Sequence, residues 1–597
     1  MTLDTDYVSP WRRFDGSQMN DKNGDHDPVV VCLHVSDLHG QLAPEYQRYY
    51  DHVESGPALE FDDDGTALER VGGVATLAAK LDEVRDAADE TLTLMSGDTF
   101  HGTAVTTYTN GRAMLEPIND HLRPDVYVPG NWDFSAEGAE DGAFRDLMAD
   151  LEAPVLANNL YEWDVDELLF PPYTVESVGD IDVGIVGMTN VYVDRMAPAF
   201  AEGKYRFGKH PVLLEEAAEA AREDGADVVL AVTEIGLPWM VQAAKDLEAV
   251  DVMFSAHTHE YTHDPIVVEE TETVVVESGV GDGLGRVDLH VEDGELAFRH
   301  VLYCLADGHA YTPDPDSEAE RTVEEIREPF LADDVHFERG EGTLERPIDT
   351  VVGRTEVPLH RRAFLESGWN ALFNDALMDH FNADLAVSHG FRYGSTIPAG
   401  EIRLEHLYRA FPMTGAVARG DAYGQQLTNH LEHFLTDNFT PYVYEQEDGR
   451  VRNFSTNVEV EIDPTAKRGR RLVDLRVDGE SVDPDARYSV ATFTRPGDPD
   501  HDLGNCGFPF RNVDVDEGSI PVDVVTDYLE DHSPVTYEPG ELVRTPADGG
   551  DVQNTPADGP YPYVQPGVDY GGADAYCETR LIPERNQFPE EGRNQFR

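Results

Sequence analysis

Polar residues that commonly bind metal ions recur at five places in this sequence, each directly after a short apolar run. The segments are Ser36-Asp37-Leu38-His39, Ser96-Gly97-Asp98, Gly130-Asn131-Trp132, Thr233-Glu234 and His257-Thr258-His259. Carboxylates, imidazoles and a neutral amide together can fill the coordination shells of two divalent ions. Such ions, about 3.5–4 Å apart, can clamp an oxyanion and generate a hydroxide nucleophile near neutral pH. The pattern therefore predicts a two-metal hydrolytic site.

The spacing within two of these segments suggests how their side chains converge. Asp37 and His39 are separated by one residue, as are His257 and His259. Alternate side chains of an extended segment point to the same side, so we expect both members of each pair to face a metal from extended backbone. Each segment alone has an ordinary explanation as a cap or a turn. Their joint order and position favour the metal site.

The apolar runs that precede these residues predict buried strands. The expected strands span residues 29–35, 91–95, 125–128, 181–187, 227–232 and 250–254, and the clearest helices between them span 73–86 and 212–224. Alternation of buried strands with helices predicts an α/β domain. Because the carboxyl ends of the strands in such sheets form the binding crevice, we expect the five polar segments to meet there.

The rest of the chain divides by composition. A polar extension (1–28) precedes the α/β domain (29–305), which ends in β-rich stretches at 266–268, 273–277 and 286–291. An acidic, proline-containing linker (306–345) carries a short helical piece at 318–330. A second domain (346–540) has a helix near 369–381 and β-like segments at 458–462, 472–477 and 488–493. The low-complexity tail (541–597) repeats T-P-A-D-G and R-N-Q-F, and carries no predicted function.

The charge balance restricts the class of protein. The 597 residues include 117 Asp and Glu against 44 Lys and Arg, a formal net charge of −73. Such a chain repels nucleic acid polymers and anionic membranes, so neither is an expected partner. The apolar content of 40% argues against an acidic disordered protein. We expect a protein of a halophile's salt-rich cytosol, of the haloarchaeal type, in which molar salt screens the carboxylates within about 3 Å.

The cysteines and the hydropathy pattern also fit a location in the cytosol. Four widely spaced cysteines, with no C-x-x-C pair, suit a reducing environment better than a disulfide framework. The first 28 residues contain no apolar signal-peptide core, and no apolar run reaches the roughly 18 residues of a membrane span. We therefore expect a cytoplasmic location. The pattern leaves the oligomeric state open.

The series D-x-H, G-D, G-N, a fourth strand-end ligand and H-x-H resembles the calcineurin-like metallophosphoesterases, and more narrowly the 5′-nucleotidases and 2′,3′-cyclic phosphodiesterases. The resemblance covers about 29–305 and, more loosely, 346–535. It implies a sandwich of sheets flanked by helices, an α+β substrate domain, and a small nucleotide substrate between them. It also implies that two divalent metals, bridged by Asp98, are bound by Asp37, His39, Asp98, Asn131, Glu234, His257 and His259.

The second domain extends the resemblance. Ser388-His389-Gly390-Phe391-Arg392, followed by Ile397 to Ile402, is similar to the family segment N-G-G-x-R…I-x-x-G-x-I, in which the arginine contacts the substrate phosphate. Arg392 suits this role because its guanidinium bonds to phosphate in bidentate fashion, although it could be a surface charge. By resemblance, Phe454 and Phe508 would stack on the base; each could instead be a core or loop aromatic.

Three positions depart from the 5′-nucleotidase pattern. Trp132 stands where the family has a histidine that stabilises the transition state or protonates the leaving group, and Ser135 lies near the place of its partner aspartate. The leaving-group proton is therefore left to His389, His101 or water. Glu234 replaces a histidine, which makes the site richer in oxygen and favours Mn²⁺ or Mg²⁺, with Zn²⁺ as a further possibility.

Three functions remain open. The leading one is hydrolysis of nucleotide phosphoesters, in which a metal-bound hydroxide attacks in line and the metals and Arg392 stabilise the developing charge. The second follows from Trp132 and Gly390-Phe391-Arg392-Tyr393-Gly394, which resemble the dimanganese thiosulfohydrolases of sulfur oxidation. Those enzymes act outside the cytoplasm on a sulfane carried by a protein cysteine. The third is a metal-stabilised binding protein without catalysis.

Overall fold

The structure is a computed structural model. It describes residues 12–13, 29–50, 66–138, 141–196, 198–292, 295–309, 311–361, 366–388, 395–438, 453–463, 466, 469–494, 510–537 and 542–544. His389, Arg392 and Phe508, which were predicted to contact substrate, lie outside these residues, as does the tail apart from residues 542–544.

The first domain contains two six-stranded sheets, each with a run of parallel strands. In the first sheet the order is β1-β16-β15-β2-β5-β6. Its parallel strands are β2 (Val30–Ser36), β5 (Thr91–Gly97) and β6 (Val126–Pro129). The hairpin of β15 (Gly283–Glu292) and β16 (Glu295–Cys304) adds antiparallel strands beside β2, and β1 (Arg12–Arg13) closes that edge.

The second sheet has the order β13-β14-β12-β11-β9-β8. Its four central strands are parallel: β14 (Thr273–Glu277), β12 (Val252–Ser255), β11 (Val228–Thr233) and β9 (Ile181–Met188). The edge strands β13 (Ile266–Val268) and β8 (Tyr173–Val178) are antiparallel to their neighbours. The polar strand ends of both sheets therefore open toward one side of the domain.

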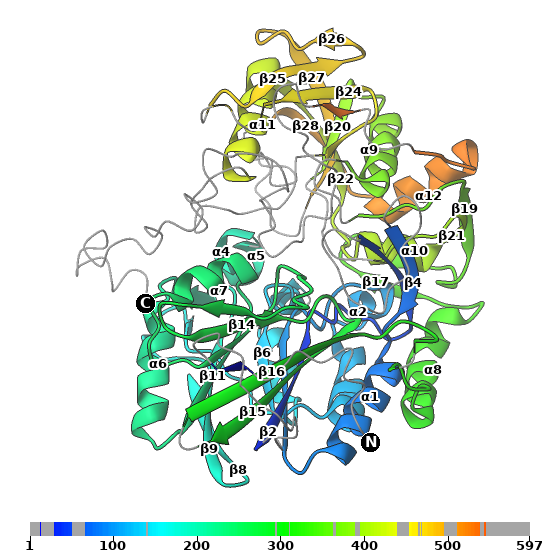
Figure 1. Ribbon diagram of the computed structural model, residues 1–597. Helices are drawn as coiled ribbons and strands as arrows, with labels where there is room; N and C mark the ends of the chain where they lie inside the picture. The colour runs from blue at the N-terminus through cyan, green and yellow to red at the C-terminus, as the bar shows by residue number, and fades with distance from the viewer. Residues whose placement is uncertain are drawn as a thin grey trace.

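Four layers form because the central strands are apolar on both faces. A hydrophobic core joins the two sheets through residues such as Leu94, Val128, Leu230 and Phe254. On the outer faces, α1 (Val74–Ala87) covers the first sheet and α8 (Ser317–Leu331) packs against α1, whereas α6 (Val212–Glu223) and α7 (Leu237–Ala244) cover the second sheet (Figure 1). The predicted sandwich of sheets flanked by helices is confirmed.

The predicted elements of this domain are all present, with ends that differ by at most three residues. Periodicity did not reveal β8, whose residues are mostly half-buried or exposed, or the hairpin of β3 (Glu45–Tyr50) and β4 (Thr66–Val71).

The segment predicted as a linker (306–345) is folded onto the first domain. Helix α8 packs on α1, and it is longer than the expected piece. The hairpin of β17 (Phe337–Arg339) and β18 (Gly342–Leu344) follows, and Phe337 stacks on Phe330 of α8 with ring centroids 4.3 Å apart. Arg339 donates hydrogen bonds to the carbonyls of Thr107 and Ser135. Acidic composition indicated a linker, but the amphipathic pattern of α8 provides an apolar face that packs.

The second domain is α+β, as predicted. A five-stranded sheet has the order β23 (Asn453–Phe454), β20 (Leu385–Ser388), β27 (Arg487–Phe493), β22 (Val417–Tyr423) and β28 (Arg511–Asp516). A four-stranded sheet beside it has the order β26 (Glu480–Ser481), β25 (Leu472–Val477), β24 (Val458–Ile462) and β29 (Val543–Arg544). Helices α9 (Gly368–Phe381) and α12 (Pro521–His532) pack together on one side, and α11 (Gly424–Asn438) contacts both sheets. The short helix α10 (Leu404–Ala410) reaches the first domain, where it contacts α2 (Ala104–Tyr108). The hydroxyls of Tyr108 and Tyr408 hydrogen-bond across this interface at 2.7 Å.

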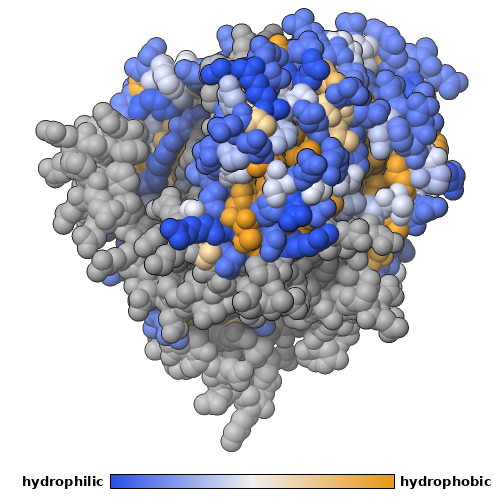
Figure 2. All heavy atoms as spheres, turned by 90° about the horizontal axis from the view of Figure 1, so that it is seen from above, coloured by the Kyte–Doolittle hydropathy of each residue, from blue (hydrophilic) through white to orange (hydrophobic). Residues whose placement is uncertain are grey.

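The described surface agrees with the polar composition. Seen from the side of the second domain, most of it is hydrophilic, with smaller hydrophobic areas between (Figure 2). Within the described residues, no helix is both long and apolar enough to cross a lipid bilayer.

Candidate metal centre

Six of the seven predicted ligands gather where the two sheets meet. Asp37 follows β2, Asp98 follows β5, and Glu234 follows β11. His257 and His259 follow β12, so both sheets contribute donors. Asp37, His39 and Glu234 are fully buried, and His257 is the most exposed of the six.

The six donors form two groups of three. The first comprises Asp37, His39 and His259, and the second comprises Asp98, Glu234 and His257; within each group the ligand atoms lie within 4.8 Å of one another. The groups adjoin, because Asp98 Oδ2 is 3.8 Å from His39 Nε2. This position between the groups is the one that a bridging carboxylate requires.

The backbone at four of the ligands adopts left-handed conformations. The φ angles of Asp37 and His39 are +48° and +45°, and those of His257 and His259 are +81° and +60°. The expectation of extended D-x-H and H-x-H segments is therefore wrong. The side chains converge because the chain turns at each ligand, and such strain in non-glycine residues persists only where the surrounding structure enforces it.

The donor set fits divalent cations. Both carboxylate oxygens of Glu234 and the Oδ1 atom of Asn131 are buried and accept no hydrogen bond from the described residues. Burial raises the pKa of Glu234 well above its usual range, and the charges of Asp37 and Asp98 raise it further. Three buried carboxylates lacking a cation are unfavourable, so bound divalent ions would satisfy both the orphaned oxygens and the charge.

His39 is suited to ligation because burial keeps its imidazole neutral. Burial lowers the pKa of His39 well below its usual range, with smaller contributions from the nearby His259 and the Arg409 charge. A neutral imidazole has a ring-nitrogen lone pair to donate to a metal.

Asn131 and Trp132 line the site at the end of β6. Asn131 is 3% exposed. The backbone N–H of Trp132 donates to Asp98 Oδ1 at 2.6 Å, and its half-buried ring stacks on His101, with centroids 4.7 Å apart and planes at 9°. Burial lowers the pKa of His101 to about 3, so this ring is neutral at pH 7. Trp132 and His101 thus form an aromatic wall beside the ligand loops.

Asp133 holds two of the ligand loops together and was not predicted to have a role. Its carboxylate accepts hydrogen bonds from the backbone N–H groups of Thr99, Phe100 and Gly130, and from the hydroxyl of Tyr127 at 2.5 Å. Burial raises the pKa of Asp133 to about 6, against the lowering effect of these bonds. The loops after β5 and β6 are therefore fixed relative to each other.

Glu277 fixes the loop after β12, which carries His257 and His259. Its carboxylate accepts from the hydroxyls of Ser255 and Thr258 and from the backbone N–H of Glu260. Glu277 is the last residue of β14 in the second sheet, and the ligands likewise stand at strand ends. This position is a signal that could have identified Glu277 from the sequence.

Phe454 does not lie where its predicted role requires. It sits in β23 (Asn453–Phe454), paired with Val387 of β20 (Leu385–Ser388), and is 6% exposed within the core between the two sheets of the second domain. Its burial there contradicts a base-stacking role. The core interpretation, open at the sequence level, is the one the structure supports.

Two family comparisons divide the chain in the same way as the fold. Residues 31–261 match the calcineurin-like phosphoesterase family, and residues 351–494 match the 5′-nucleotidase C-terminal domain family.

Relatives and solved structures span most of the chain. Protein UshA of Yersinia enterocolitica is 22% identical over 562 residues, covering 86% of this chain and 94% of that protein. A 5′-nucleotidase of Vibrio parahaemolyticus is 23% identical over 559 residues, covering 86% of this chain and 91% of that protein. Among solved structures, the sulfate thiohydrolase SoxB of Thermus thermophilus matches with a TM-score of 0.75 and 23% identity. The match covers 88% of this chain and 98% of that one. A 5′-nucleotidase precursor from the same organism has a TM-score of 0.70, 20% identity, and coverage of 87% and 99%.

Proposed function

Because this chain joins a calcineurin-like phosphoesterase domain to a 5′-nucleotidase C-terminal domain, we propose that it hydrolyses the phosphoesters of small nucleotides. Its class is that of a metal-dependent phosphoester hydrolase. The observation that carries the proposal is the pair of adjoining three-donor groups, buried at the seam of the two sheets. Nucleotide monoesters and 2′,3′-cyclic nucleotides are the substrates that we would test first.

Each donor group would hold one ion. Asp37, His39 and His259 would bind the first, and Asp98, Glu234 and His257 the second, with Asn131 completing a shell. When bound, two divalent ions supply Lewis acidity and ionise water near neutral pH. The second group contains two carboxylates, and this oxygen-rich set favours Mn²⁺ or Mg²⁺.

The remaining side chains orient the ligands and shape the site. The N–H of Trp132 fixes one oxygen of Asp98, so the other oxygen is directed toward the first group. The Trp132 ring cannot transfer a proton, and His101 behind it is held neutral by burial. We therefore propose that the leaving-group oxygen takes its proton from water or from His389, and that Arg392 binds the phosphate.

A phosphate-release assay tests this function. The enzyme would be assayed in about 2–4 M KCl, a range set by charge screening, with Mn²⁺ and with nucleoside monophosphates, 2′,3′-cyclic nucleotides and p-nitrophenyl phosphate. Asp98→Ala removes the carboxylate between the donor groups and should abolish turnover. Arg112→Gln, which breaks only an exposed ion pair with Asp150, is the matched control. Absence of turnover in wild-type enzyme that binds two Mn²⁺ would contradict the proposal.

The stacked Trp132 supports a second candidate. An aromatic wall in place of a proton donor suits substrates whose leaving group needs no protonation, such as a thiolate sulfur. The fold of this chain is also that of the sulfate thiohydrolase SoxB. Turnover of a persulfide-linked sulfonate on a cysteine peptide, with none of any nucleotide, would favour this candidate. Two bound metals without turnover of either ester would favour a binding protein.

A further inference from the structure

We propose that Arg409 of the second domain is a positioning residue for the metal centre, acting through the backbone of His39. Arg409 belongs to α10 and is 5% exposed, wedged against the ligand loops of the first domain. This inference rests on the proposed metal assignment but not on which ester is hydrolysed.

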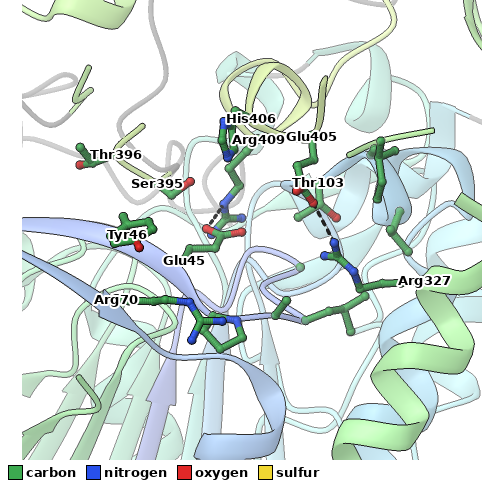
Figure 3. Close-up of a pocket in the computed structure, with 17 residues that line it drawn as sticks. Glu45, Tyr46, Arg70, Thr103, Arg327, Ser395, Thr396, Glu405, His406 and Arg409 are labelled. Atoms are coloured by element: carbon green, nitrogen blue, oxygen red, sulfur yellow. Dashed lines mark hydrogen bonds and ion pairs between the residues drawn. The ribbon is translucent and has the colours of Figure 1, made fainter. Parts of the chain in front are cut away.

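The guanidinium of Arg409 bonds to three groups of the first domain. Its Nη1 donates to the carbonyl of His39, and to the carbonyl of Gly102 at 3.2 Å. Its Nε donates to Glu45 Oε2 at 2.7 Å, and this ion pair lies at the edge of the cavity between the domains (Figure 3). One side chain therefore ties together the loop after β2, the loop after β5 and the β3 hairpin.

Both backbone polar groups of His39 are thereby fixed. Its N–H donates to the carbonyl of Asp98 at 2.7 Å, and its carbonyl accepts from Arg409. Because His39 holds a left-handed φ of +45°, its backbone relaxes away from this geometry unless such contacts hold it. The imidazole direction follows from the backbone, so Arg409 sets where the Nε2 lone pair points.

Gly102 shows that the loops are closed tightly around this contact. A Cβ atom at Gly102 would lie 2.2 Å from the His39 carbonyl oxygen. Arg409 can hold the two carbonyls and Glu45 at once because Nη1 and Nε belong to one rigid planar guanidinium, which a lysine ammonium lacks.

A second arginine in the same cavity provides a matched control. The cavity, of about 280 Å³, is also lined by Arg327, which pairs with Glu405 at 2.8 Å (Figure 3). Arg327 has no hydrogen bond to a metal-ligand loop among the described residues. Loss of an ion pair from this cavity can therefore be separated from loss of the contact to His39.

The test is a titration of metal-free full-length protein with Mn²⁺. Wild type, Arg409→Gln, Arg409→Lys and Arg327→Gln would be compared by calorimetry and by the electron paramagnetic resonance signal of bound Mn²⁺, with thermal melting as a check on folding. We expect Arg409→Gln to weaken binding at one of the two sites about 10–100-fold, the usual effect of removing a residue that orients a ligand. Arg409→Lys should recover only part of the loss, and Arg327→Gln should bind as wild type does.

Two Mn²⁺ bound at wild-type affinity by Arg409→Gln would overturn the inference. An equal loss of Mn²⁺ affinity in Arg327→Gln would also overturn it. The loss would then come from disturbing the interface between the domains and not from the contact with His39. Should Arg409→Gln fail to fold, the comparison of Arg409→Lys with Arg327→Gln decides in the same way. Wild-type protein that binds no Mn²⁺ would remove the metal assignment and this inference with it, whereas metal binding without ester turnover would affect only the proposed function.

Discussion

The Nε2 atoms of His39 and His259 lie 3.1 Å apart, with their rings edge to face at 81°. The two residues follow strands of different sheets, so this contact joins the two halves of the sandwich. Two imidazole nitrogens at this distance cannot both carry a proton, but two lone pairs can share one cation. The pair therefore marks the place where the first of the two proposed metals would bind.

Replacing His259 should remove one metal and leave the other. His259→Gln deletes a ligand of the first group, whereas Asp98, Glu234 and His257 keep the second group intact. We expect bound Mn²⁺ to fall from two to about one per chain and phosphate release to fall by at least about 100-fold, since a lost ligand exceeds the effect of a lost orienting partner. Metal content of desalted protein measures this. His263→Gln alters a half-buried histidine nearby that is in neither group, and this variant should retain both metals.

Trp132→His tests whether the missing proton donor limits turnover. A histidine here would stand beside Asp98 and could protonate a leaving oxygen, an effect typically of about 10²–10⁴-fold. We expect a larger gain with nucleoside monophosphates than with p-nitrophenyl phosphate, whose leaving group needs no proton. Trp132→Phe keeps an aromatic ring against His101 and should show no such selectivity. Equal effects on both substrates would contradict the explanation.

Gly102→Ala should disrupt the metal centre by steric clash. The added Cβ would lie 2.2 Å from the His39 carbonyl, at a φ of +134°. Gly225→Ala is the matched control, because its φ is +109° but nothing lies within 4 Å of the added atom. We expect Gly225→Ala to lower the free energy of unfolding by about 1–2 kcal/mol through backbone strain alone. Gly102→Ala should lower it further and weaken Mn²⁺ binding, as urea melts and metal titration would show.

The contribution of Glu277 to the stability of the metal-free protein should fall as pH rises from about 4.5 to about 7. Burial, and then the charge of Asp37, raise the pKa of Glu277 from 4.5 to about 7. The folded state therefore keeps this proton to higher pH than the unfolded state does. The stabilisation is complete below pH 4.5 and is lost as pH approaches 7, by up to about 3 kcal/mol. Glu277→Gln should flatten this part of the curve in urea melts; an unchanged slope would contradict the prediction.

The acidic surface predicts that salt stabilises the fold. With a net charge of −73, mutual repulsion should destabilise the compact state until ions screen it. We propose that the protein is halophilic, and we expect its melting temperature to rise steeply between about 0.2 and about 3 M KCl, the range over which the screening length becomes a few ångströms. Sucrose at equal osmolality favours the buried state of apolar groups but does not screen charge, so it should raise the melting temperature less than KCl does. Equal effects would count against charge repulsion.

Sequence patterns located the strands, and therefore the donors, because buried parallel strands are continuous apolar runs and ligands follow their ends. Asp37, Asp98, Glu234 and the two histidines of the H-x-H segment were found in this way. The local backbone was not predictable. The alternation rule assumed extended chain, whereas Asp37 and His39 turn left-handed under constraints from other loops.

Residues that act through distant partners left no local signal. Arg409 precedes an apolar stretch and reads as the end of a helix, yet its carbonyl partner is 370 residues away. Phe454 is the opposite case. The family resemblance predicted that it stacks on the substrate base, whereas it packs in the core of the second domain. Pairing over such separations is decided by packing between domains, which one-dimensional periodicity does not contain.

The order of these residues along the chain has a consequence for biosynthesis. Every donor of the two metal groups precedes residue 260, so a nascent chain that has completed both sheets already holds the full ligand set. Arg409 emerges from the ribosome much later, and domains generally fold from the N-terminus as they are made. A truncated chain ending before α10 would therefore carry all six donors with the His39 loop unsecured. If Arg409 secures the His39 loop as proposed, the proposed metal centre would be completed only once the second domain has been made.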